Sequence, residues 1–129
     1  MQSFLLQDWV TVGADTDRGI KDVTQAAGGW LDLGFASDVT FFLEVSRGST
    51  AGNLFMNYET SPLRDARGFR ALKELQITDA SSVAEVTRVA LYDDAAPPVS
   101  RWVRWRLSQD LGTGVWDLAF RITVMAYAR

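Results

Sequence analysis

Cysteine and histidine are both absent from this chain. Without cysteine there can be no disulfide bond, thiol nucleophile or thiolate metal ligand. Without histidine there can be no imidazole ligand and no catalytic triad that uses histidine as its base. The two absences do not indicate a redox compartment, because a chain without thiols is stable in either one. We therefore expect a protein that carries no metal and no cofactor.

Long apolar runs are missing as well. No stretch approaches the ~20 consecutive apolar residues that a membrane-spanning helix needs. Residues 1–8 lack the basic start and the apolar core of a signal peptide. These features predict a soluble protein that is made in the cytoplasm and has no membrane partner.

Lysine is scarce, since Lys21 and Lys73 are the only two, and arginine supplies nearly all the positive charge. The net charge is −3, whereas nucleic-acid binders usually carry a strongly basic face. We therefore expect no nucleic-acid partner. Arginine suits protein interfaces, where its planar guanidinium makes bidentate and stacked contacts. It is also the residue that a GC-rich genome favours.

Apolar and aromatic residues, in contrast, are plentiful. The chain has 129 residues, of which 47% are hydrophobic, with seven Phe, five Trp and three Tyr. This length suits one domain over residues 1–129. Such a domain buries about 65–70% of its unfolded surface and needs no disulfide to be stable.

The C-terminal part has the clearest strand pattern. Five apolar residues at every second position share one face, namely Trp116, Leu118, Phe120, Ile122 and Val124, and Asp117, Arg121 and Thr123 lie on the other. The run before it, 101–107, places Val103, Trp105 and Leu107 on one face. Turn-forming residues fill the segment 108–114 between the two runs. We therefore expect one long antiparallel hairpin, with Asp117 and Arg121 beside the outward Trp102, Arg104 and Arg106.

Strands are also expected earlier in the chain. Leu5 to Val12 begins the fold, and the first four residues are either an ordered strand or a loose arm. Arg18 to Thr24 is a weak strand. Asp38 to Ser46 is a strong one, with Val39, Phe41, Leu43 and Val45 on one face and Phe42 and Glu44 on the other. We expect 53–60 to be its antiparallel partner across a flexible turn at 47–52.

The segment from Leu63 to Leu75 fits either a helix or a loop followed by a strand. We favour a loop over 64–67 and a strand from Phe69 to Thr78, because Gly68 weakens a helix and both neighbouring segments are strands. Val83 to Tyr92 is a further strand. About eight strands separated by Gly, Pro, Asp and Ser predict an all-β, antiparallel β-sandwich with jelly-roll or other Greek-key topology.

The acidic residues do not form a catalytic or metal-binding motif. Asp15-Thr16-Asp17 matches a fragment of a calcium loop without the remaining ligands. Asp93-Asp94 precedes two prolines, and Asp110 lies in a turn. Nothing in the sequence pairs two carboxylates as a glycosidase requires. We therefore expect a protein that is not an enzyme.

The most basic and aromatic stretch combines Arg101, Arg104 and Arg106 with Trp102 and Trp105. Such a stretch could bind single-stranded nucleic acid. We favour a structural or protein-interface face, because strand alternation separates its members. Exposed aromatic residues could also form a sugar-binding platform, and the candidates are Trp9, Trp30, Trp102, Trp116, Tyr58 and Tyr92.

Four stretches resemble strand segments of small structural proteins from tailed bacteriophages, of the head decoration type. They are Leu33-Gly34-Phe35-Ala36-Ser37-Asp38-Val39-Thr40-Phe41-Phe42-Leu43-Glu44-Val45, Tyr58-Glu59-Thr60-Ser61-Pro62, Val103-Arg104-Trp105-Arg106-Leu107 and Trp116-Asp117-Leu118-Ala119-Phe120-Arg121-Ile122. The resemblance implies a jelly-roll-like sandwich in the virion that self-associates, often as a trimer, and reinforces the capsid by binding the major capsid protein.

The interface of such an assembly is expected on the N-terminal segment and on the polar face of the C-terminal strands. The candidate interface residues are Phe4, Trp9, Trp102, Arg104, Arg106 and Arg121. Two other functions remain open, a carbohydrate-binding sandwich of a phage adhesion device and a component of the tail or neck.

Overall fold

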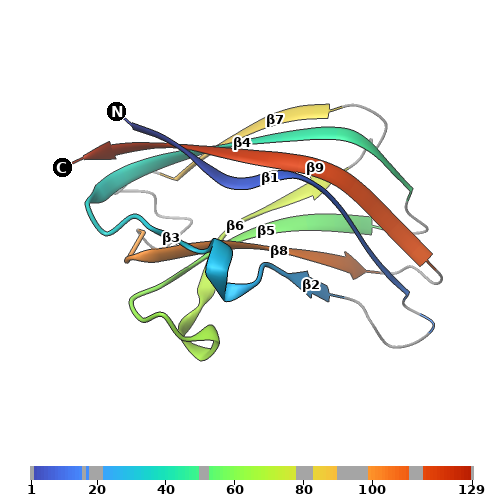
Figure 1. Cartoon of the computed structure of the whole chain (residues 1–129), viewed down its shortest axis with the longest axis horizontal. Helices are drawn as coiled ribbons and strands as arrows, with labels where there is room; N and C mark the ends of the chain where they lie inside the picture. The colour runs from blue at the N-terminus through green and yellow to red at the C-terminus, as the bar shows by residue number, and fades with distance from the viewer. Residues whose placement is uncertain are drawn as a thin grey trace.

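The computed structural model shows two antiparallel sheets packed face to face (Figure 1). It describes residues 2–15, 17, 22–49, 53–77, 83–89, 99–110 and 115–128. The first sheet has the order β1 (Gln2–Asp15), β9 (Val115–Ala128), β4 (Ala36–Ser49) and β7 (Val83–Val89). The second has the order β2 (Asp22–Thr24), β8 (Trp102–Asp110), β5 (Asn53–Ser61) and β6 (Arg70–Ile77), and the short β3 (Leu31–Asp32) also pairs with β8.

This strand order is that of a jelly roll. The first and last strands are neighbours in one sheet, and β2 and β8 are neighbours in the other. The chain crosses between the sheets after β1, β3, β4, β6, β7 and β8. The expected all-β sandwich and the jelly-roll alternative are therefore confirmed. The described residues contain one strand more than the eight expected, and none of their helices could span a membrane.

The expected C-terminal hairpin is wrong. β8 pairs with β2, β3 and β5, whereas β9 pairs with β1 and β4 in the opposite sheet. The expected pairing of β4 with β5 is wrong for the same reason, because β4 lies between β9 and β7. Turn-forming residues between two strands show that the chain reverses. They do not show whether it returns in the same sheet or in the facing one.

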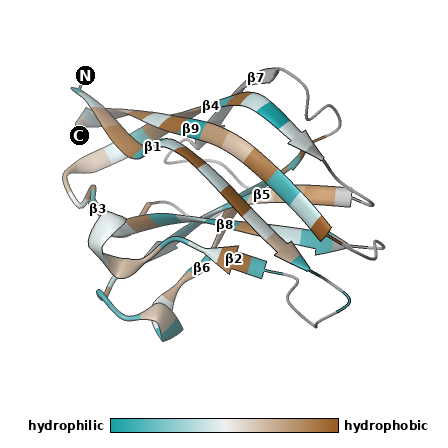
Figure 2. Ribbon diagram, turned by 45° about the vertical axis from the view of Figure 1, so that its right-hand side comes forward, coloured by the Kyte–Doolittle hydropathy of each residue, from teal (hydrophilic) through white to brown (hydrophobic). Residues whose placement is uncertain are grey.

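The faces of these strands, in contrast, are predicted correctly. The two rows that alternation placed inward, Val39 to Val45 and Trp116 to Val124, are each at most 3% exposed. Figure 2 shows hydrophobic and hydrophilic positions along β9. Tyr58 stacks on Phe41 with ring centroids 4.0 Å apart, and Trp105 meets Phe120 edge-on at 5.0 Å. Aromatic pairs from opposite sheets therefore fill the centre of the core.

A buried amide links the edges of the two sheets. The Nε2 of Gln25 donates to the carbonyl of Leu6 at 2.7 Å and to that of Gly29 at 2.9 Å. Its Oε1 accepts a hydrogen bond from the backbone N–H of Trp105 at 3.3 Å. The indole of Trp105 in turn donates to the Oε1 of Gln7 at 3.1 Å. These contacts hold β1 to β8 where no backbone ladder joins the two strands.

The ambiguous segment forms a loop and a strand, as favoured. β5 ends at Ser61, a 3₁₀ turn covers Ala66–Gly68, and β6 follows. Leu72 and Ile77 are buried in β6. The first residues of the chain, which could have been a loose arm, belong to β1 from Gln2 onward. The expected features at 18–21, 50–52, 78–82, 90–98 and 111–114 lie outside the described residues.

Candidate interaction surfaces

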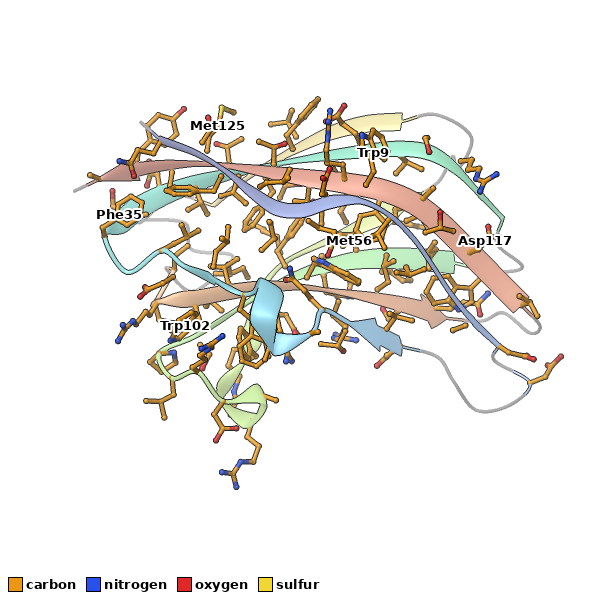
Figure 3. All side chains as sticks on the ribbon, in the orientation of Figure 1. Trp9, Phe35, Met56, Trp102, Asp117 and Met125 are labelled. Carbon is orange, nitrogen blue, oxygen red and sulfur yellow. The ribbon has the colours of Figure 1, made fainter. Side chains whose placement is uncertain are left out.

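The residues expected to form one interface lie on two opposite faces of the sandwich. Trp102, Arg104 and Arg106 belong to β8 in the second sheet, whereas Trp9 and Arg121 belong to β1 and β9 in the first sheet. Figure 3 shows Trp9 on the first sheet and Trp102 on the second. Phe4 is half-buried against the core and lies 5.9 Å from the ring of Phe35. The structure therefore does not bring the six residues together.

Arg104 and Arg106 share one buried carboxylate. The Nε of Arg104 donates to Glu59 Oε1 at 2.9 Å, and the Nε of Arg106 donates to Glu59 Oε2 at 3.2 Å. Arg106 also reaches Asp22 at 3.2 Å. Glu59 is only 7% exposed and Arg104 only 9%. The two cations are thus compensated within the chain, and β8 lacks the free positive charge that phosphate binding would need.

Two aromatic rings cover Arg104 from outside the sheet. Its guanidinium carbon lies 4.0 Å from the ring centroid of Phe69 and 5.5 Å from that of Trp30. The two rings meet edge-on at 4.7 Å. Phe69 precedes β6 and Trp30 follows the 3₁₀ turn Ala27–Gly29. Arg104 therefore acts inside the fold, where cation–π contacts and the ion pair hold two connections against the sheet.

Trp102 is half-buried, and arginines occupy its surroundings. Arg64 and Arg101 place their guanidinium carbons 5.1 and 5.5 Å from its ring. Arg101 is held by two hydrogen bonds to Asp32 at 3.0 and 3.1 Å. The bond from Arg101, aided by the backbone N–H of Gly34, lowers the pKa of Asp32, and the same pair raises the pKa of Arg101. The Trp102 ring is therefore partly covered by side chains of the same chain.

On the first sheet, Trp9 packs over a second ion pair. Arg121 donates to Glu44 Oε1 at 2.7 and 2.9 Å, and its guanidinium carbon lies 5.0 Å from the Trp9 ring. Trp9 nevertheless remains 45% exposed. The ion pair of Arg121 with Glu44 thus joins β9 to β4.

Apolar residues lie close together on the outer face of the first sheet next to this pair. In the register, Leu5 of β1 opposes Thr123 of β9, which opposes Phe42 of β4, which opposes Val86 of β7. Leu5 is 48% exposed and Val86 is 65% exposed, while Phe42 and Met125 are half-buried. We name these four apolar residues the outer band. The sequence placed Phe42 on the outer face, but it could not align it with Leu5 and Val86.

A hollow of about 360 Å³ lies on the other side of Trp9, open to solvent. We call it the Trp9 groove. Its lining comes from three adjacent strands and consists of Trp9, Val10, Thr11, Ser46, Arg47 and Ala119. Both outer walls contain a β-bulge, one between Gln7 and Val10 in β1 and one between Val45 and Arg47 in β4. Bulges redirect side chains locally, and strict alternation cannot reveal them.

The acidic candidates form no metal site in the described part of the chain, where no three carboxylates cluster. The Oδ1 of Asp15 accepts a hydrogen bond from the backbone N–H of Asp17 at 3.0 Å, as in an ordinary turn. Asp93, Asp94 and Tyr92 lie outside the described residues, as does the side chain of Asp110. Of the other aromatic candidates, Trp116 and Tyr58 are fully buried.

No protein-family model matches this chain, and no curated protein matches it in sequence. Its structure is similar to the K1 cleaved adhesin domain of Lys-gingipain from Porphyromonas gingivalis, with a TM-score of 0.52, 16% identity and 98% of each chain covered. It is also similar to VP2 of the infectious bursal disease virus subviral particle, with a TM-score of 0.55, 9% identity and 98% of this chain covered. The chain spans 32% of VP2. At these identities the similarity shows a shared fold.

Proposed function

We propose that this chain is a non-enzymatic structural protein of a virion, of the decoration type found on the heads of tailed bacteriophages. It self-associates, as a trimer, and binds the major capsid protein. The jelly-roll topology supports this role, because 32% of a viral capsid protein, VP2, is similar to this chain in structure. The decoration type is chosen because the strand pattern of the sequence resembles that of phage head proteins.

The observation that carries the proposal is the outer band. Leu5 and Val86 expose large apolar side chains in one row with Phe42, on a face that no other element covers in the described part of the chain. Contiguous exposed apolar surface of this kind marks protein–protein contacts. In a closed cyclic assembly every subunit buries this surface against its neighbours. No copy of the surface is then left exposed to solvent.

The outer band is therefore the self-association surface, with Trp9 and Arg121 at its rim. Of the six residues expected at an interface, these two lie beside the outer band. Arg104 and Arg106 are committed to Glu59 inside the chain. The major capsid protein is then contacted by surfaces away from the first sheet, where Arg64 and Arg101 present exposed guanidinium groups.

Light scattering coupled to gel filtration tests this surface. We expect a trimer for the parent chain and a monomer for the double variant Leu5→Lys, Val86→Lys, because lysine at the centre of an interface is costly to desolvate. The matched control is Leu63→Lys, which changes an equally exposed leucine (64%) in the connection after β5 and should remain trimeric. A monomeric parent chain at high micromolar concentration would contradict the proposal.

Attachment to the head is tested by sedimenting the protein with empty capsids. Binding that saturates near a fixed ratio to the major capsid protein would support a decoration protein. A gene located among tail genes, together with no binding to capsids, would instead favour the tail or neck alternative.

A further inference from the structure

Trp9 is held in a fixed orientation although nearly half of it is exposed. Arg121 supports the ring by a cation–π contact at 5.0 Å, and two hydrogen bonds to Glu44 fix Arg121 in turn. The backbone N–H of Trp9 donates to the carboxylate of Asp8 at 2.8 Å. An exposed indole that is oriented in advance costs little entropy when a ligand stacks on it. The apolar C–H face of a pyranose ring is the type of group that stacks on such a ring.

Polar groups face the same hollow from the neighbouring strands. Thr11 and Ser46 supply hydroxyl groups, of which Ser46 donates to the carbonyl of Ala119 at a long 3.5 Å. Arg47 is exposed, and no ion pair joins it to another side chain among the residues that the structure describes. Its guanidinium is thus available to bind a carboxylate through two parallel hydrogen bonds.

The backbone at this place departs from a regular sheet on both sides of β9. The bulges at 7–10 of β1 and at 45–47 of β4 bring Trp9 and Arg47 to opposite walls of one groove. Its volume of about 360 Å³ lies at the lower end of the range for small-molecule sites. From these observations together, we propose that the Trp9 groove binds a pyranose sugar that bears a carboxylate, of the uronic or sialic acid class.

Each wall of the groove is expected to bind a different part of the ligand. Trp9 takes the apolar face of the sugar ring, Arg47 takes its carboxylate, and the hydroxyl groups of Thr11 and Ser46 reach the ring hydroxyls. The open shape of the groove predicts a dissociation constant on the order of 1 mM for one sugar unit. Multiple copies in an assembly would raise the apparent affinity for a polyvalent glycan surface.

This function goes beyond the proposed structural role and does not depend on it. Thr11, Ala119 and Arg47 oppose one another across three strands and line the Trp9 groove. Trp9, Arg121 and Glu44 lie between these residues and the outer band. The groove therefore lies at the rim of the self-association surface. The oligomeric state reports on the structural role, while sugar binding reports on the groove.

Titration of the ¹⁵N-labelled full chain, followed by NMR, tests the groove. The ligands are the methyl glycosides of glucuronic acid and N-acetylneuraminic acid, with methyl glucoside, sodium acetate and sodium sulfate as comparisons, each to roughly 20 mM. We expect shifts at Trp9, Thr11 and Arg47 with the acidic sugars, and at least about tenfold weaker binding of methyl glucoside and acetate. Equal binding of acetate or sulfate would show a bare anion site and overturn the sugar assignment.

Five variants locate the site. Trp9→Ala and Arg47→Gln should each weaken binding of the acidic sugar about tenfold or more, and Arg47→Lys should restore part of it. Trp102→Ala and Arg101→Gln change the same residue types on the opposite face and should leave binding unchanged. Absence of any shift at Trp9 with the acidic sugars, or loss of binding with Trp102→Ala, would overturn the proposal.

Discussion

At the scale of single residues, Arg104 shows which properties of a side chain a strand pattern can predict and which it cannot. Alternation assigned it correctly to the outward side of β8, opposite Trp105. It did not show that Trp30 and Phe69 fold over that side, because both belong to connections whose paths are set by tertiary packing. An outward residue therefore became a buried one. The exposure of an outward side chain depends on whether another segment covers that face of the sheet. The sequence of a single strand does not show this.

The ion pair of Arg104 with Glu59 should be important for stability, because losing the anion leaves a buried cation without a partner. We expect Glu59→Gln to lower the free energy of unfolding by about 3 kcal/mol. Glu44→Gln removes the carboxylate of a pair that is about one-third exposed and should cost less than about 1 kcal/mol. Urea denaturation of both variants measures the difference. Equal losses would contradict the buried role of Glu59.

At the scale of elements, the inward and outward faces could be predicted and the pairing of strands could not. The period of two residues in β4 and β9 identifies the inner face wherever one side contacts the core. The partner of each strand depends on where the chain crosses between sheets. The bulges in β1 and β4 add a second limit, since they shift the alternation next to Trp9 and Arg47. The Trp9 groove lies where that pattern is interrupted.

The pairing of β1 with β9 depends on a glycine. A Cβ at Gly13 would lie 2.8 Å from the carbonyl oxygen of Trp116, which belongs to the backbone and cannot easily move. We expect Gly13→Ala to lower the free energy of unfolding by about 1–2 kcal/mol. Gly28→Ala is the control, because a Cβ there meets nothing within 4 Å and the change should stay within about 0.5 kcal/mol. Thermal unfolding of both variants would refute this if Gly13→Ala unfolds no earlier than Gly28→Ala.

At the scale of the whole molecule, the last strand completes the fold. β9 lies between β1 and β4 and contributes five fully buried side chains, which are Trp116, Leu118, Phe120, Ile122 and Val124. β1 and β4 each pair with β9 and not with each other. A jelly roll therefore forms only after distant segments have met, which makes folding slow, on the order of milliseconds to seconds.

Deleting residues 115–129 should accordingly abolish the fold, because it removes the centre of the first sheet and part of the core. We expect the near-ultraviolet circular dichroism of the buried tryptophans to disappear and the amide spectrum to collapse to unfolded values. Deleting residues 1–3 is the control, since Gln2 and Ser3 are exposed at the end of β1. A native-like spectrum after removal of β9 would contradict the central place of this strand between β1 and β4.

The adjacency of β1 and β9 also bears on how the molecule could be rearranged. Gln2 pairs with Ala126, and the two ends emerge side by side at one end of the sandwich (Figure 1). Paired residues of antiparallel strands lie only about 5 Å apart, so a short glycine-rich linker could join the ends. New termini could then be opened in another connection to give a circular permutant. The same geometry means that cargo fused to either end would project from the same site.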